Sequence, residues 1–260
     1  MTPPLLLTGG TGALGRLVVP LLREAGCPVR VLSRHRQDPA DGIEFVTGDL
    51  ATGEGVAAAV AGVGTIVHCA GSAKGDADKA RTLVRAAAEA GAQHLVYISV
   101  VGAGRIPIGY FAAKGEAERI VADSGLPWTT LRATQLHDLT LLTVSQLAKM
   151  PVIPVPVGFR FQPVDSGEVA ARLVELSLGE PAGPVPDIAG PRVYEMDELV
   201  RSYLRSTHRR RLIMPIRVPG RGARALRSGA NLAPEHAVGQ RTWEDFLAER
   251  VPSVPARSGR

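Results

Sequence analysis

The sequence predicts an α/β fold with a doubly wound parallel sheet, and three observations lead to it. Short apolar segments alternate with helical patterns along the first 140 residues. These segments are apolar enough to be buried on both faces, which is typical of parallel strands covered by helices. The stretch LLLTGGTGALGRLVVPLL, residues 5–22, places a glycine cluster between the first apolar segment and the first helical pattern. Alternation at this spacing implies right-handed crossovers between parallel strands.

Turn residues bound each predicted element. Strands are expected at 4–9, 28–34, 43–49, 64–71, 94–100 and 127–134. Helices are expected at 13–26, 53–62, 76–91 and 110–125, and Gly26, Gly91 and Gly125 mark the ends of the three longer ones. Pro20 lies inside the first helix, so we expect a kink or a shortened first segment there.

Composition limits the class of protein. With 260 residues and 45% apolar content, the chain can form one large domain, or one domain with a small lobe. No apolar stretch reaches membrane-spanning length, and MTPPLLLTGG lacks the basic start of a signal peptide. A cytoplasmic protein is therefore expected. Cys27 and Cys69 form no metal or disulfide spacing and are expected to be buried thiols.

The net charge of +5 is unevenly distributed. Nine arginines and no acidic residue lie between Arg201 and Arg227. Such a patch could attract nucleic acid or an anionic ligand. Because no nucleic-acid motif accompanies it, a solvated surface or the rim of a cofactor site is the favoured interpretation.

The opening glycines predict a dinucleotide site of the Rossmann type. Gly9, Gly12 and Gly15 permit a tight turn, close approach of a pyrophosphate, and close packing of helix on strand, in that order. The helix N-terminus then offers N–H groups and a positive dipole end to the phosphates. No Lys-Ser/Thr pair follows, which disfavours a P-loop. The remaining loop residues assigned to this site are Thr11, Ala13 and Leu14.

The end of the second strand indicates which cofactor is bound. NAD binders typically carry an acidic residue there, whereas this chain has SRHRQ at 33–37. Arg34, supported by His35 or Arg36, can pair with a 2′-phosphate, so NADP(H) is favoured over NAD. The alternative is that these are solvated loop charges.

Two further strand ends fit a dinucleotide. In GDL at 48–50, Asp49 could accept a hydrogen bond from the adenine amino group, and Leu50 follows it. In HCAG at 68–71, the small residues Ala70 and Gly71 would let the cofactor lie against the backbone. Either segment could also be an ordinary transition from strand to loop.

The pattern changes after about residue 140. The region 135–165 is Pro-rich and irregular, and helices are expected again at 166–179 and 196–206. We therefore expect residues 1–140 to form the NAD(P)-binding core and residues 141–260 a small C-terminal substrate lobe packed on the same domain. The tail VPSVPARSGR lacks apolar periodicity and is expected to be frayed.

Tyr110 and Lys114 carry the predicted chemistry. At i and i+4 on a helix they share one face. A nearby ammonium lowers the pKa of a phenol, and such a Tyr can give a proton to a carbonyl oxygen. Ser99, at the end of the fifth strand, could hold the substrate oxygen. The alternative is an exposed helix-surface pair.

His137 and Asp138 follow the sixth strand, where a structural histidine is favoured over a pocket residue. No metal-ligand pattern is present in the sequence, so no metal is expected.

Taken together, TGGTGALG, GDL, HCAG, YIS and YFAAK resemble the short-chain dehydrogenase/reductase superfamily. The match is closest to its atypical, NmrA-like NAD(P)-binding branch, to which LPWTTLRATQLHD, FQPVD and TWEDFL are also similar. The resemblance spans roughly residues 4–250. It implies that the three motif glycines bind pyrophosphate, that Arg34 selects NADP and that Asp49 contacts adenine. It also implies that Ser99, Tyr110 and Lys114 are catalytic, with Lys114 holding the nicotinamide ribose.

The chain departs from the family pattern at two places. The 11 residues from Ser99 to Tyr110 are fewer than is usual in the superfamily, and HCAG stands where typical members have Asn-Ala-Gly. The resemblance further implies that relatives lacking the Tyr can be redox sensors instead of enzymes. We therefore expect an NADP(H)-dependent reductase of a small carbonyl, quinone or enone, with a non-catalytic NADP(H) sensor as the alternative. A nucleotide-sugar epimerase or dehydratase is a third, less favoured possibility. The sequence does not identify the substrate, and a monomer or homodimer is expected.

Overall fold

The computed structural model describes residues 3–38, 42–71 and 75–251, and most of the predicted tail lies outside these ranges. The chain divides into two compact units. Unit 1 comprises residues 1–133 and 166–187, and unit 2 comprises residues 134–165 and 188–260. Helix α6 (Ser166–Leu178), which the sequence analysis grouped with the C-terminal lobe, therefore belongs to unit 1.

Unit 1 is built on a seven-stranded sheet in the order β3-β2-β1-β4-β5-β6-β9, with every pairing parallel. The predicted doubly wound fold is confirmed, since this is the strand order of two mononucleotide-binding halves. Its strands are β1 (Leu5–Thr8), β2 (Val29–Ser33), β3 (Ile43–Thr47), β4 (Thr65–His68), β5 (His94–Val100), β6 (Trp128–Ala133) and β9 (Gly183–Pro184). The strands β1, β2, β4 and β5 are mostly buried, whereas β3 is partly exposed because it lies at the sheet edge.

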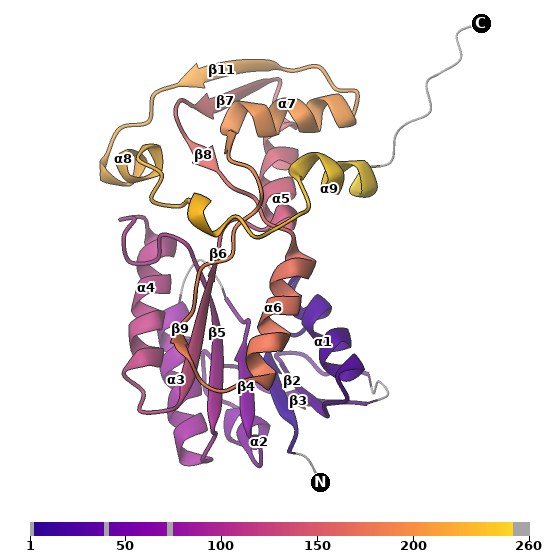
Figure 1. Cartoon of the computed structure of the whole chain (residues 1–260), viewed down its shortest axis with the longest axis vertical. Coiled ribbons are helices and arrows are strands. Elements are labelled where there is room, and N and C mark those ends of the chain that lie inside the picture. The colour runs from indigo at the N-terminus through magenta and orange to yellow at the C-terminus, as the bar shows by residue number, and fades with distance from the viewer. Residues whose placement is uncertain (1–2, 39–41, 72–74, 252–260) are drawn as a thin grey trace, which may run out of the picture. The chain divides into compact units, whose positions relative to one another are not determined.

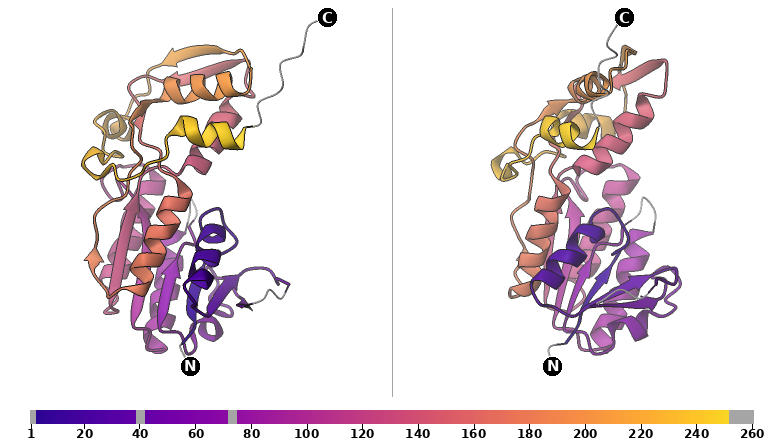
Figure 2. Two further views of the ribbon diagram at one scale, coloured as in Figure 1. Left: turned by 45° about the vertical axis from the view of Figure 1, so that its right-hand side comes forward. Right: turned by 90° about the vertical axis from the view of Figure 1, so that its right-hand side faces the viewer.

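Helices cover both faces of this sheet (Figures 1 and 2). Helices α3 and α4 pack side by side, as do α1 and α6. The helices of unit 1 are α1 (Gly15–Glu24), α2 (Val56–Val60), α3 (Asp76–Glu89), α4 (Gly109–Ala122) and α6. Helix α1 is shorter than expected and continues through Pro20.

The core of unit 1 lies between the sheet and the helices α2, α3 and α4. Leu6, Ile66 and Leu95 extend from three neighbouring strands and are fully buried, together with Leu83 of α3 and Val121 of α4. The apolar residues of each helix therefore lie on one side of that helix and pack against one face of the sheet, as expected for amphipathic helices.

Unit 2 contains more regular structure than the sequence predicts. Residues 135–165, expected to be irregular, include the helix α5 (His137–Leu147), the strand β7 (Val152–Pro156) and the strand β8 (Arg160–Phe161). The other elements are β10 (Tyr194–Glu195), α7 (Met196–Ser206), β11 (Leu212–Ile216), α8 (Arg221–Arg227), a short 3-10 turn (Pro234–His236) and α9 (Trp243–Arg250). Strand β11 pairs with β7 in parallel, and β10 pairs with β8 antiparallel.

Buried polar side chains connect the segments of unit 2. The Gln162 side chain accepts from Ala233 N at 3.0 Å and donates to Gly190 O at 2.9 Å, while Asn231 Nδ2 donates to Arg160 O at 2.8 Å. These contacts join residues far apart in sequence, which explains why periodicity predicted only the helix at 196–206 in this unit.

Candidate functional site

The turn between β1 and α1 has the backbone that the glycine motif predicts. Gly9 has φ 76°, and a Cβ there would lie 2.6 Å from Ala70 N. A Cβ at Gly15 would overlap the Gly9 carbonyl oxygen. Gly9 therefore supplies the tight turn and Gly15 the close packing of helix on strand. Gly12, whose N–H donates to Gly9 O at 2.9 Å, lies between them on the exposed side.

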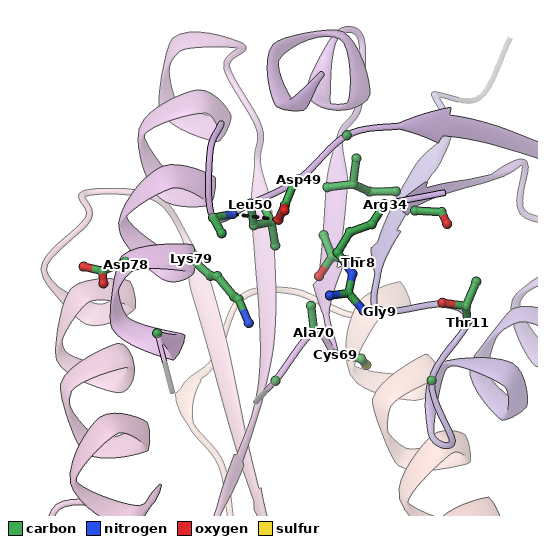
Figure 3. Close-up of a pocket in the computed structure, with 17 residues that line it drawn as sticks. Thr8, Gly9, Thr11, Arg34, Asp49, Leu50, Cys69, Ala70, Asp78 and Lys79 are labelled. Atoms are coloured by element: carbon green, nitrogen blue, oxygen red, sulfur yellow. Dashed lines mark hydrogen bonds between the residues drawn. The ribbon is translucent and has the colours of Figure 1, made fainter. Parts of the chain in front are cut away.

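This turn borders a cavity of about 580 Å³ in unit 1. The cavity lies at the carboxyl ends of β1 and β4, where the strand order reverses and open α/β sheets bind ligands. Its wall includes predicted cofactor residues from four separate segments (Figure 3). These are Gly9, Thr11, Gly12, Arg34, Asp49, Leu50, Ala70 and Gly71.

Some predicted residues lie elsewhere. Ala13, Leu14 and Gly15 are not among the described residues that line the cavity. His35 and Arg36 are exposed and also lie outside its wall, so among these three neighbours Arg34 alone faces the cavity. Asp49 Oδ1 accepts from Ala51 N at 2.9 Å, which fixes the carboxylate at the cavity edge.

Lys79 of α3 is a cavity residue that sequence reasoning missed. Figure 3 shows the Lys79 ammonium and the Arg34 guanidinium extending into the same space from different sides. Two cations in one cavity suit a ligand with several phosphate charges. A signal was available, because Lys79 lies in the first turns of the helix that follows the fourth strand, near the edge where ligands bind. Ser33, at the end of β2, also lines the cavity and was missed.

Lys114 is held in a buried cage beside this cavity. Its Nζ lies 3.2 Å from Asp76 Oδ2, 3.3 Å from Tyr97 Oη and 3.4 Å from the Ile98 carbonyl oxygen. The side chains of Lys114 and Asp76 are only 6% and 2% exposed. An ammonium has three N–H donors, and these three acceptors match them in number. Asp76 and Tyr97 are further residues that the sequence analysis did not single out.

Gly71 connects the cage to the cavity. It lines the cavity wall, and a Cβ placed on it would lie 3.2 Å from Lys114 Nζ. The ammonium therefore lies directly behind a bare stretch of the cavity wall, where only a glycine lets a ligand come close.

The expected effect of Lys114 on Tyr110 is wrong in direction. Burial, and then the charge of Asp76, raise the pKa of the Tyr110 phenol to about 12. The expectation considered the ammonium alone, whereas here a carboxylate neutralises that ammonium. The half-buried Tyr110 phenol thus keeps its proton at neutral pH.

Ser99 lies near this cage on the same strand. Ser99 and Tyr97 are two residues apart on β5 and so face the same side of the sheet. Ser99 is 1% exposed, and within the described parts of the chain its hydroxyl has no hydrogen-bond partner. Buried polar atoms are normally paired, so this hydroxyl is an exception among the described residues.

His68 extends the polar cluster below the cavity. Its Nδ1 and Thr8 Oγ1 share a hydrogen bond of 2.6 Å, and its ring stacks on Tyr97 with centroids 5.4 Å apart. Burial, together with the charges of Lys114 and Lys79, lowers the pKa of His68 to about 3. The imidazole is therefore neutral across the physiological range.

This neutral histidine predicts a loss of stability in mild acid. The unfolded chain binds a proton at His68 below about pH 6.5, but the folded chain does so only near pH 3. Stability is therefore full above pH 6.5 and falls as the pH drops toward 3, by up to about 1.4 kcal/mol per pH unit from this group. Urea unfolding at pH 7 and pH 5 checks it. We expect the free energy of unfolding of His68→Gln to fall less between pH 7 and pH 5 than that of wild type. The exposed variant His35→Gln should show the same fall as wild type.

The structure also places the histidine and the two cysteines that the sequence analysis discussed. His137 is fully buried in unit 2, with its ring 4.9 Å from that of Phe246 and its Nδ1 3.7 Å from Asp165 Oδ2. This placement agrees with the structural histidine favoured from the sequence. Cys27 and Cys69 are half-buried free thiols, so the expectation of full burial is wrong for both. Cys69 lines the cavity, and burial raises the pKa of its thiol to about 12.

No group of three potential metal ligands occurs among the residues that the structure places. In the same ranges, no helix is both long and apolar enough to cross a membrane.

The glycine turn at a helix N-terminus, the cavity at the strand-order reversal and its two cations define a dinucleotide-binding protein of the Rossmann type. The model of the NAD(P)H-binding family matches residues 9–148, more than half of the chain, and the chain belongs to this family. It is thus an NAD(P)-binding protein with a Rossmann-type fold.

Comparison with known proteins gives relatives of several activities. The chain is 28% identical over 177 residues to an NAD(P)H azoreductase of Xenophilus azovorans, covering 66% of this chain and 62% of that protein. It is 33% identical over 142 residues to a (4-alkanoyl-5-oxo-2,5-dihydrofuran-3-yl)methyl phosphate reductase of Streptomyces griseus, covering 53% and 49%. The chain thus spans less than two thirds of these relatives.

A solved structure matches almost the whole chain. The NADPH-dependent quinone oxidoreductase of Escherichia coli, complexed with NADPH, aligns with a TM-score of 0.80 and 18% identity. The alignment covers 94% of this chain and 99% of that one. At this identity the likeness establishes the fold.

Proposed function

We propose that the protein is an NADP(H)-dependent oxidoreductase that reduces a small carbonyl, quinone or enone substrate. The observation that carries the proposal is the cavity of unit 1. Its wall includes the glycine turn, two cations and the bare backbone of Gly71 in front of the caged Lys114. The reductase relatives and the family match support it.

The wall fits a dinucleotide phosphate on physical grounds. Gly12 leaves the backbone bare at the helix N-terminus, where N–H groups and the helix dipole favour a diphosphate. Arg34 would bind the 2′-phosphate, and Lys79 would add a second cation in the same cavity. The bound cofactor would supply the hydride.

The chain's own residues would handle the proton and the substrate oxygen. Tyr110 keeps its phenol protonated at neutral pH, as a proton donor for reduction must. Ser99 carries a hydroxyl without a partner in the described structure, which is available to hold the substrate oxygen. Lys114, fixed by Asp76 and Tyr97, would act as a positioned charge at the wall behind Gly71.

The direct test offers the protein NADPH with a panel of quinones, azo dyes and aldehydes and follows NADPH absorbance. Turnover with at least one class supports the proposal. A protein that binds NADPH and NADP+ with different affinities but turns over none of the panel would instead be a sensor, and the reductase proposal would fail. That the protein acts in the cytoplasm, and that it is a monomer or homodimer, remain predictions.

Arg34 should determine the preference between the two nicotinamide cofactors. Removing a charge-assisted hydrogen bond costs about 1.5–3 kcal/mol, so Arg34→Ala is expected to weaken NADPH binding by about tenfold to a hundredfold. NADH binding should change little, because NADH lacks the 2′-phosphate. Calorimetric titration of both cofactors measures this. Arg36→Ala is the matched control, since Arg36 is exposed and outside the cavity wall. Equal weakening of both cofactors would contradict the assignment.

A further inference from the structure

Two segments of unit 2 carry basic residues and no acidic ones. No Asp or Glu occurs between Asp138 and Asp165, nor between Glu198 and Glu235. These two segments contain Lys149, Arg160 and all nine arginines of the basic patch. They meet where β11 pairs with β7, in a register from Leu212 opposite Val152 to Ile216 opposite Pro156 (Figure 1).

The cations at the start of this ladder line a pocket. Lys149, Pro151, Arg210, Arg211 and Leu212 surround an open space of about 540 Å³. Arg211 Nε donates to Ala148 O at 3.3 Å and its Nη1 to Arg210 O at 2.8 Å, which holds the guanidinium beside the pocket.

Among the residues that the structure describes, no carboxylate neutralises these charges. Within the described ranges, none pairs with Lys149, Arg210 or Arg211 in the manner of Arg192 with Glu198 or Arg201 with Asp197, elsewhere in unit 2. Arg209, which precedes this pair of arginines, and Arg217, which follows β11, are likewise exposed. The face thus presents concentrated positive charge to a partner.

Large apolar side chains are exposed among these cations. Leu212 is 66% exposed and Met214 is 47% exposed. They are two residues apart on β11 and therefore face the same side of the strand. Val157, just after β7, is also exposed. Exposed apolar groups flanked by arginines are typical of surfaces that lie at a membrane interface.

We propose that this basic face, formed by Lys149, Arg209, Arg210, Arg211 and Arg217 around Leu212 and Met214, docks on an anionic lipid bilayer. The cations would contact lipid phosphates, and the two apolar side chains would enter the boundary between headgroups and acyl chains. Nucleic acid fits this face less well, because single strands require exposed aromatic side chains for stacking. The aromatic residues of the two segments, Phe159, Phe161 and Tyr203, are buried or half-buried.

The test is cosedimentation of the full chain with vesicles of phosphatidylcholine alone or with a third of phosphatidylglycerol. Wild type should bind the anionic vesicles, and this binding should weaken as the salt concentration is raised. Each basic residue at such a surface strengthens binding by about fivefold, so Arg209→Gln/Arg210→Gln/Arg211→Gln should weaken it by about a hundredfold. Leu212→Ser/Met214→Ser should also weaken it, while the net charge is unchanged.

A charge-matched control separates this face from net charge. Arg23→Gln/Arg85→Gln/Arg119→Gln removes three exposed arginines from unit 1 and should bind nearly as wild type. Thermal melting checks that all variants are folded. The proposal is overturned if wild type ignores anionic vesicles, if both triple variants weaken equally, or if a short single-stranded RNA binds more tightly than the vesicles do.

Discussion

Replacing Asp76 by Asn is expected to lower the free energy of unfolding by about 3–5 kcal/mol, because it leaves the buried Lys114 ammonium without its counter-charge. The two side chains are almost fully buried, so water cannot compensate the lost carboxylate. Urea denaturation at pH 7 measures the change.

Two further variants test the cause of this loss. Asp78→Asn on the same helix removes an exposed carboxylate that pairs with exposed Arg81, and should cost less than about 1 kcal/mol. The double variant Asp76→Asn/Lys114→Met removes both charges and should regain at least half of the lost stability, as replaced buried pairs often do. If the double variant is no more stable than Asp76→Asn, the ion pair is not the cause.

Tyr110→Phe is expected to lower kcat for NADPH-dependent reduction by about a hundredfold to ten-thousandfold, the usual contribution of a general acid. NADPH affinity should stay close to that of wild type, because Tyr110 is not among the described residues lining the cofactor cavity. Steady-state kinetics with a responding substrate, and calorimetry with NADPH, measure the two effects separately.

The matched control is the second tyrosine of the site. The Tyr97 hydroxyl oxygen accepts a hydrogen bond from Lys114 Nζ at 3.3 Å, so its place in the site is to hold the ammonium. Tyr97→Phe removes one hydrogen bond of the cage and should lower kcat by about fivefold. A larger loss of kcat for Tyr97→Phe than for Tyr110→Phe would mean that Tyr110 is not the proton donor.

The pH profile gives a separate test of Tyr110. Because its pKa is raised to about 12, the phenol remains a proton donor throughout neutral and moderately alkaline pH. The kcat for reduction should therefore not fall between pH 7 and pH 9 through this group. A fall with a midpoint near pH 8 that Tyr110→Phe abolishes would mean that the ammonium does lower the pKa of Tyr110.

Most of unit 1 could be predicted from the sequence because its determinants are local. The glycine turn, the apolar strands and the helix-ending glycines act over a few residues, and β5 (His94–Val100) has the predicted bounds. The helix α5 was missed because its exposed Leu139 and Leu142 blur the apolar stripe of an amphipathic helix. The strands β7 and β11 were missed because prolines interrupt both and they stabilise each other across about sixty residues of sequence.

The sequence by itself determined the fold class, the bend that would seat a diphosphate and Arg34 as the cation at the end of β2, because each depends on neighbouring residues. Only the tertiary structure decided what surrounds Lys114. Its partners Asp76 and Tyr97 come from α3 and β5. Because these partners are buried with Lys114, their charge and hydrogen bond affect the ammonium more than its i,i+4 spacing to Tyr110 does. The direction of the Tyr110 pKa shift therefore depends on packing between elements, which helical spacing does not encode.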